Sequence, residues 1–190
     1  MSAQPRHRSA IVQSAAALFR RNGYSATGLA DIVERSGAPK GSLYHYFPGG
    51  KAQIGEAAVT SAGELVRRTL ATLALETQDA PALVAEYVRW LVIWMEQSAW
   101  RDGCPITTVL LETAAQDEAM RAAGRTAFAG WSAVIAGKLE HDGWSAAVAA
   151  ERARFAIAAL EGSLIQARVE QSPAPILAAG RLLGVLLRKA

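Results

Sequence analysis

The chain has 190 residues, of which 51% are hydrophobic and 19% charged, and this composition excludes an intrinsically disordered protein. No run of 18 apolar residues occurs, so a membrane-spanning segment is excluded, and residues 1–8 lack the apolar stretch of a signal peptide. Because Cys104 is the single cysteine, no intrachain disulfide can form, and we expect a cytoplasmic protein.

The net charge of +3 is unevenly distributed along the chain. Residues 1–51 contain seven basic and two acidic side chains, whereas the rest of the chain contains 13 basic and 15 acidic ones. A basic N-terminal segment on a slightly acidic body indicates contact with a polyanion. On charge alone, ordinary solvated surface charge explains the pattern equally well.

Helical spacing of apolar residues is found almost everywhere, and no segment alternates as a strand does. Alanine occupies 40 positions and leucine 19, which also favours helix. We therefore predict an all-α fold of about nine helices. The first three helices are expected around Ile11–Phe19, after Thr27 as N-cap, and over Lys40–Phe47. The next three are expected from Lys51 past Leu73, from Pro81 to Trp100, and as a short helix that ends at Ala114. The last three are expected from Gln116 to His141, from Ser145 to Glu170 and from Ile176 to Arg188.

Residues 27–47 have the arrangement of a helix-turn-helix motif: two short helices joined by a turn of three residues, Gly37-Ala38-Pro39. At about 100° per residue, Leu43 and Phe47 of the second helix face the core, and Gly41 and His45 lie opposite. We expect a three-helix DNA-binding domain over residues 1–50 and a larger helical domain over residues 51–190.

The outward face of the second helix offers groups that can bond phosphates and base edges. They are the Ser42 hydroxyl, the His45 imidazole and the phenols of Tyr44 and Tyr46, with Lys40 at the start of the helix and bare backbone at Gly41. An ordinary amphipathic surface is the alternative, but three consecutive aromatic residues on so short a helix favour a binding face.

The segment Gly37–Phe47 resembles the recognition-helix signature of the TetR family of transcriptional regulators, and residues 23–27 and Lys51 also fit it. Segments similar to the LmrA/YxaF-like branch of that family are residues 26–29, 47–51, 103–106 and 159–162. The resemblance implies a repressor that binds double-stranded operator DNA of pseudo-palindromic sequence as a homodimer. A small hydrophobic, aromatic effector would release it.

The same resemblance assigns roles to residues of the N-terminal domain. Thr27 would cap the second helix and bond a phosphate. Lys40, Gly41, Ser42, Tyr44 and His45 would line the major-groove contact, and Tyr46 and Lys51 would clamp phosphates. Two features depart from the family pattern: three residues rather than two separate Phe47 from Lys51, and Gly28 replaces a common hydroxyl residue.

The last two predicted helices are expected to form the dimer interface. Residues 146–169 are apolar almost all round, and the final helix carries one apolar stripe. The core of a monomer is the alternative. The predicted interface residues are Ala156, Ala159, Ser163, Ile176, Ala179, Gly180, Leu183 and Leu187.

Aromatic side chains at helical spacing predict an apolar effector pocket in the larger domain. For any single tryptophan, packing in the core is the alternative. The predicted lining residues are Trp90, Trp94, Cys104, Thr107, Thr108, Leu111, Phe128, Trp131, Phe155 and Glu161.

Catalytic chemistry finds no support in the sequence. His7, His45 and His141 belong to no metal-spaced cluster or nucleophile–base set, and we expect neither an enzyme nor a cofactor. A helix N-terminus would favour the thiolate of Cys104, but no second cysteine is present to resolve an oxidised one. Two other hypotheses are an effector-independent, architectural DNA-binding protein and a small helical enzyme with a vestigial DNA-binding head. The large, aromatic-containing body favours a ligand-responsive regulator.

Overall fold

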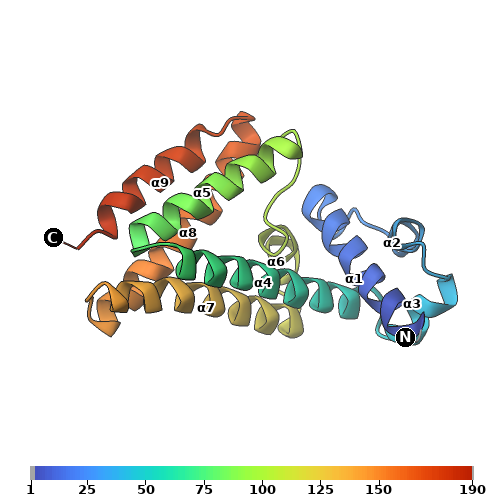
Figure 1. Ribbon diagram of the computed structural model, residues 1–190. Helices are drawn as coiled ribbons and strands as arrows, with labels where there is room; N and C mark the ends of the chain where they lie inside the picture. The colour runs from blue at the N-terminus through green and yellow to red at the C-terminus, as the bar shows by residue number, and fades with distance from the viewer. Residues whose placement is uncertain (1–2, 190) are drawn as a thin grey trace. The chain divides into compact units, whose positions relative to one another are not determined.

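The computed structural model describes residues 3–189, with side chains from Arg6 onward. Within these residues the chain forms nine helices and no strand, which confirms the predicted all-α class (Figure 1). None of the described helices is both long and apolar enough to cross a membrane. The helices are α1 (Ala3–Asn22), α2 (Leu29–Ser36), α3 (Lys40–Tyr46), α4 (Gly50–Glu76), α5 (Ala80–Gln97), α6 (Thr107–Thr113), α7 (Glu118–His141), α8 (Ala146–Glu170) and α9 (Ala174–Leu186).

Local sequence signals set most of the helix ends. Asp79 is the N-cap of α5, and its carboxylate accepts a hydrogen bond of 2.8 Å from the backbone N–H of Ala82. Gly37 ends α2 in the left-handed conformation, with φ of 63°, which a residue with a Cβ rarely adopts. The prediction for the start of α2 is wrong by one residue, since the N-cap is Gly28 rather than Thr27.

The chain divides into two compact units that do not follow the expected boundary at residue 50. The first unit holds the chain as far as Glu64 together with Cys104–Ala127, and the second holds Leu65–Gly103 together with the chain from Phe128 onward. Helix α4 continues without a break from Gly50 to Glu76, so no linker follows the N-terminal helices. The first unit therefore contains α6 and the start of α7 as well as α1, α2 and α3.

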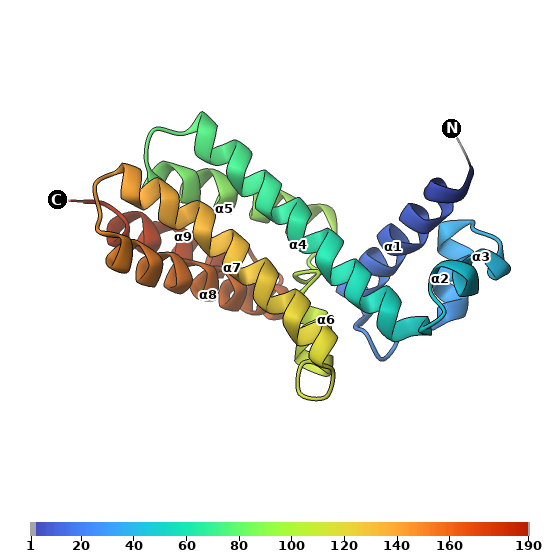
Figure 2. The ribbon, with the colours of Figure 1, turned by 90° about the horizontal axis from the view of Figure 1, so that it is seen from below.

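In the first unit, α1 packs against α2, α3 and α6 (Figure 2). Helices α4 and α7 approach closely there, because a Cβ added at Gly63 would lie 2.7 Å from the Cβ of Ala127. The core of this unit consists of large side chains that are fully buried. They include Ile11, Phe19, Ile32, Leu43, Phe47, Ile54, Ile106 and Met120.

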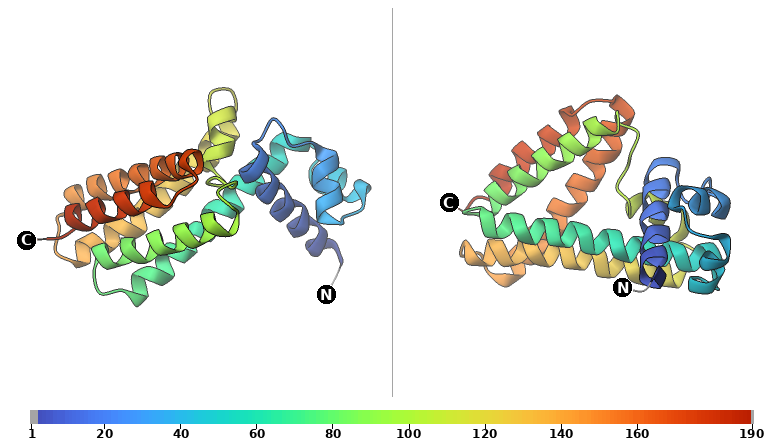
Figure 3. Two further views of the ribbon diagram at one scale, coloured as in Figure 1. Left: turned by 90° about the horizontal axis from the view of Figure 1, so that it is seen from above. Right: turned by 45° about the vertical axis from the view of Figure 1, so that its right-hand side comes forward.

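In the second unit, α9 packs against both α5 and α8 (Figure 3). Gly180 of α9 allows close approach to α5, since a Cβ there would lie 2.9 Å from a methyl of Val88. Lys138 of α7 closes the end of α4, where its ammonium donates hydrogen bonds of 3.1 Å and 2.6 Å to the carbonyls of Ala74 and Thr77. A cation beside the last carbonyls of a helix satisfies acceptors that the helix leaves open.

Candidate nucleic-acid interface

Helix α3 presents a single outward face, and its orientation is the predicted one. Leu43 and Phe47 are buried, at 0% and 1% exposure, whereas Tyr44 is 53% exposed. Lys40, Gly41 and His45 are also exposed, and Ser42 and Tyr46 are half-buried. By helix geometry Gly41 and His45 point away from the core, Tyr44 lies beside them, and Lys40 is exposed at the first residue of α3.

The outward face of α3 combines flat aromatic groups with open backbone. The rings of His45 and Tyr46 meet edge to face, with centroids 5.0 Å apart. A Cβ added at Gly41 would meet nothing within 4 Å, so the backbone there lies bare. Beneath the helix, the guanidinium of Arg8 lies 5.4 Å from the centroid of the Phe47 ring. The face thus offers hydroxyl, imidazole and ammonium groups on a rigid support, which suits contacts to base edges and phosphates.

The expected phosphate contact of Thr27 is wrong for its side chain. Thr27 is fully buried, and its hydroxyl donates a hydrogen bond of 2.8 Å to the carbonyl of Gly23. Its backbone N–H donates to the carbonyl of Tyr24 at 3.2 Å. Both donors are therefore used inside the turn that joins α1 to α2, and Thr27 holds the shape of this turn.

Lys51 lies along the same turn. Its ammonium is 3.3 Å from the carbonyl oxygen of Ser25, to which it donates, and 4.5 Å from the centroid of the Tyr24 ring. The side chain is half-buried between these groups. Lys51 supports the turn before α2 in this conformation, and its role as a phosphate clamp stays a prediction.

Sequence reasoning missed a role for Glu112 of α6 at the same turn. Its two carboxylate oxygens accept hydrogen bonds of 2.8 Å each from the backbone N–H groups of Tyr24 and Ser25. The hydrogen bond of the Ser25 side chain lowers the pKa of Glu112, against an opposing effect of burial. The two backbone donors and the charge of Lys51 lower this pKa further. No signal within the sequence links these groups, because Glu112 lies 87 and 88 residues away along the chain.

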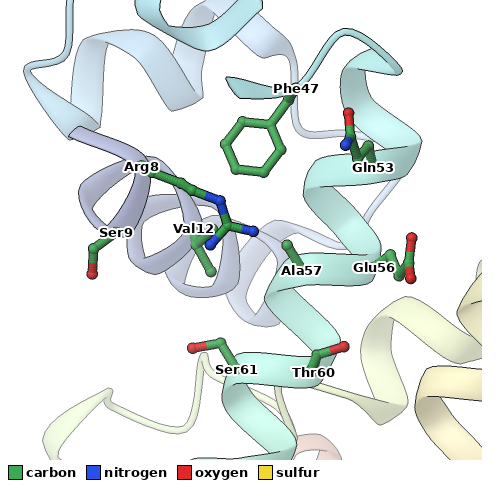
Figure 4. A pocket seen from close by; sticks show the side chains of 9 residues that line it. All are labelled: Arg8, Ser9, Val12, Phe47, Gln53, Glu56, Ala57, Thr60 and Ser61. Atoms are coloured by element: carbon green, nitrogen blue, oxygen red, sulfur yellow. The ribbon is translucent and has the colours of Figure 1, made fainter. Parts of the chain in front are cut away.

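An open cavity of about 560 Å³ lies in the first unit between α1, the end of α3 and α4 (Figure 4). The ring of Phe47 and the guanidinium of Arg8 face its interior (Figure 4). None of the ten predicted effector residues lines it. Its lining residues are Arg8, Ser9, Val12, Phe47, Gln53, Glu56, Ala57, Thr60 and Ser61.

The predicted effector residues are divided between the two units. Cys104, Thr107, Thr108 and Leu111 belong to the first unit, and the other six belong to the second. Trp131 is buried, and its ring meets that of Phe128 edge to face at 5.3 Å. In contrast, Trp90, Leu111 and Phe155 are more than half exposed on the protomer surface. Trp94 and Glu161 are half-buried.

Most of the predicted interface positions lie in the core of the protomer. Ala156, Ser163, Ile176, Leu183 and Leu187 are buried within the protomer itself, so they offer little surface to a partner, and their place in an interface stays a prediction. Ala159, Ala179 and Gly180 are half-buried. The large apolar side chains that α8 and α9 do expose are Phe155, Ile165, Val169, Leu177, Leu182 and Val185.

Comparison with known proteins identifies the family. Residues 11–58 match the model described as bacterial regulatory proteins, tetR family, and residues 80–182 match the LmrA/YxaF-like C-terminal domain of transcriptional regulators. The regulator YxaF of Bacillus subtilis is 31% identical over 189 residues, which cover 100% of this chain and 99% of YxaF. The chain belongs to the TetR family of DNA-binding transcriptional regulators.

Other relatives and solved structures agree with this family. The regulator LmrA of Bacillus subtilis is 31% identical over 96% of this chain and 97% of its own. A regulator of Mycobacterium tuberculosis, Rv0196, is 37% identical over 90% of this chain and 88% of its own. The crystal structure of a TetR regulatory protein from Rhodobacter sphaeroides has a TM-score of 0.81 at 24% identity, and covers 93% of this chain and 96% of that one. That structure supports the fold.

Substitutions on the outward face of α3 should weaken DNA binding without unfolding the protein. For Tyr44→Ala and Lys40→Ala, we expect a loss of about 1–3 kcal/mol in binding to a duplex that the wild type selects from a randomised pool. Arg89→Ala, an exposed cation paired with Glu86 on α5, is the control and should leave binding unchanged. Fluorescence anisotropy at several salt concentrations measures both effects. Wild-type affinity in both α3 variants would reject the assignment of this face.

Proposed function

We propose that the protein is a repressor that binds a pseudo-palindromic operator as a homodimer and is released by a small hydrophobic effector. The outward aromatic face of α3, held by the buried Leu43 and Phe47, is the observation that carries this proposal. Major-groove recognition by a helix-turn-helix protein uses such a face, and two-fold operators match two-fold protein symmetry. A bound repressor would act by occupying DNA near a promoter.

The exposed apolar side chains of α8 and α9 support the homodimer. On α8, Phe155, Ile165 and Val169 fall on one stripe, because three and four residues in succession return to the same helix face. On α9, Leu182 and Val185 are each more than 70% exposed. A monomer would leave these large side chains in water. In an isologous interface the same surface of both protomers is used, so each side chain would be buried in both copies.

A charge placed on either stripe should break the dimer. We expect Val169→Glu and Val185→Glu to lose about 3–5 kcal/mol of dimerisation free energy each, because each buries an unpaired carboxylate. Both positions are exposed in the protomer, so the fold should remain. Leu75→Glu on α4 is the matched control, since Leu75 is 88% exposed and lies outside both stripes. Sedimentation velocity checks the association state.

Binding to the selected duplex provides a second test of the proposed homodimer. The monomeric variants should also lose tight binding to the selected duplex, since two heads that engage together bind far more strongly than one. A wild-type monomer that binds the duplex tightly would contradict the proposed homodimer.

The Phe128–Trp131 pair supports an aromatic effector. Trp131 is buried and Phe128 is half-buried, and their edge-to-face contact belongs to the second unit, outside the DNA-binding head. An aromatic compound could pack a further ring against this pair, edge to face or offset-stacked, as aromatic rings prefer. Trp94, half-buried on α5 of the same unit, is a second candidate contact.

Tryptophan fluorescence should detect the effector and separate a regulator from an effector-independent DNA-binding protein. Among two- and three-ring aromatic compounds, we expect one to quench the wild type and Trp144→Phe, but not Trp131→Phe. Trp144 is a suitable control because the Arg152 guanidinium covers its ring at 4.0 Å. The selected duplex should weaken binding of that compound by about 5- to 150-fold, since coupling is reciprocal. Equal affinity with and without duplex would favour the effector-independent protein.

A further inference from the structure

We propose that Glu112 is a positioning residue for DNA binding, through which α6 holds the turn before α2 in the shape that the DNA-binding head requires. The turn comprises residues 23–27 and leads directly into the helix-turn-helix. The regulatory consequence, that a shift of α6 would release DNA, rests on the proposed function.

The turn satisfies only part of its own hydrogen bonding. Gly23 donates to the carbonyl of Phe19, and Thr27 donates from its backbone and its hydroxyl. The backbone N–H groups of Tyr24 and Ser25 instead donate to Glu112. Two successive N–H groups after a left-handed residue form a concave anion-binding nest. Gly23 supplies that left-handed residue, with φ of 88°, and the carboxylate of Glu112 fills the nest.

The surroundings of the carboxylate are fitted to it. A Cβ added at Gly23 would lie 2.5 Å from Oε1 of Glu112, and the positive φ of Gly23 also disfavours any residue with a side chain there. Lys51 adds a positive charge that lowers the pKa of Glu112, while its ammonium donates to the carbonyl of Ser25. The turn is thus held from α6 by an anion and from α4 by a cation.

The chain position of α6 makes this contact a link between the two halves of the protein. Cys104–Ala127 belongs to the compact unit that contains the DNA-binding helices. The same residues lie inside the segment 80–182, which matches the LmrA/YxaF-like C-terminal domain of transcriptional regulators. A change in the C-terminal half that displaces α6 would therefore withdraw Glu112 from the turn.

Electrostatics and positioning predict opposite effects of removing this carboxylate. A polyanion binds more tightly when a negative charge is removed from the DNA-binding unit, so a purely electrostatic role predicts stronger binding. Positioning predicts weaker binding, because glutamine leaves one of the two donors of Tyr24 and Ser25 without an acceptor, alanine leaves both without one, and the turn becomes free to change shape. The sign of the change therefore separates the two roles.

The variants are Glu112→Gln and Glu112→Ala, with Glu118→Gln as the matched control. Glu118 lies in the same unit and is exposed, but it accepts hydrogen bonds from Arg121 and Arg125 of its own helix. We expect the Glu112 variants to bind the duplex selected by the wild type about 5- to 30-fold more weakly, a factor equivalent to losing one or two hydrogen bonds. Glu118→Gln should bind equally well or more tightly.

Backbone amide measurements test the contact without DNA. The Tyr24 and Ser25 amides should exchange with solvent faster in Glu112→Gln than in the wild type, and Glu118→Gln should leave them unchanged. In the wild type, both amide shifts should titrate with a midpoint below the ordinary pKa of a glutamate side chain. Because the folded pKa is lowered, the contact is complete above that value and is lost as the pH falls through the folded pKa.

Two results would overturn the proposal: unchanged exchange of both amides in Glu112→Gln, or duplex binding by that variant as tight as that of the wild type. The thermal unfolding midpoint of Glu112→Gln shows whether weaker binding reflects loss of the fold, and a midpoint matching that of Glu118→Gln supports positioning. A wild type that binds DNA without responding to any effector would contradict the proposed function, while the comparison of Glu112 with Glu118 would still decide this proposal.

Discussion

The burial of Leu43 and Phe47 beneath α3 is the interaction on which the proposed DNA-binding face depends. A helix of seven residues has too few hydrogen bonds to be stable alone, so packing must hold it. Both side chains are buried in the core that contains Phe19 and Ile32. Their spacing of four residues fixes the rotation of α3 about its axis, and this rotation leaves Tyr44 and His45 exposed.

The turn before α2 adds a second constraint, which comes from a distant part of the chain. The α3 face is useful only if α2 and α3 keep their places, and the turn of residues 23–27 is where the chain enters α2. Glu112 accepts the two amide donors that this turn does not satisfy itself. The DNA-binding unit therefore includes residues 104–127 as well as the N-terminal helices. The head therefore depends on a residue within the segment 80–182, which matches the C-terminal domain model of the family.

Much of the fold could be predicted because its signals are local. Apolar spacing located the helices, and Gly37 and Pro81 lie close to the ends of two of them. The prediction that Thr27 caps α2 failed because a threonine hydroxyl has two local options. It can cap a helix, or it can donate to the carbonyl four residues earlier, and Thr27 donates to the carbonyl of Gly23. Helix α8 misled because small apolar residues surround it, so periodicity could not separate the inward Ala156 from the outward Phe155. The contact of Glu112 with the turn was missed because its partners are 87 and 88 residues away in the sequence.

The central claim of the proposed function is that two copies of the α3 face read one operator together. Hydroxyl-radical footprinting of the selected duplex, combined with the mass of the complex, tests it most directly. The account predicts two protected regions about 10 base pairs apart, or a multiple of that spacing, and an even number of protomers on each duplex. A single protected region bound by one protomer would contradict it.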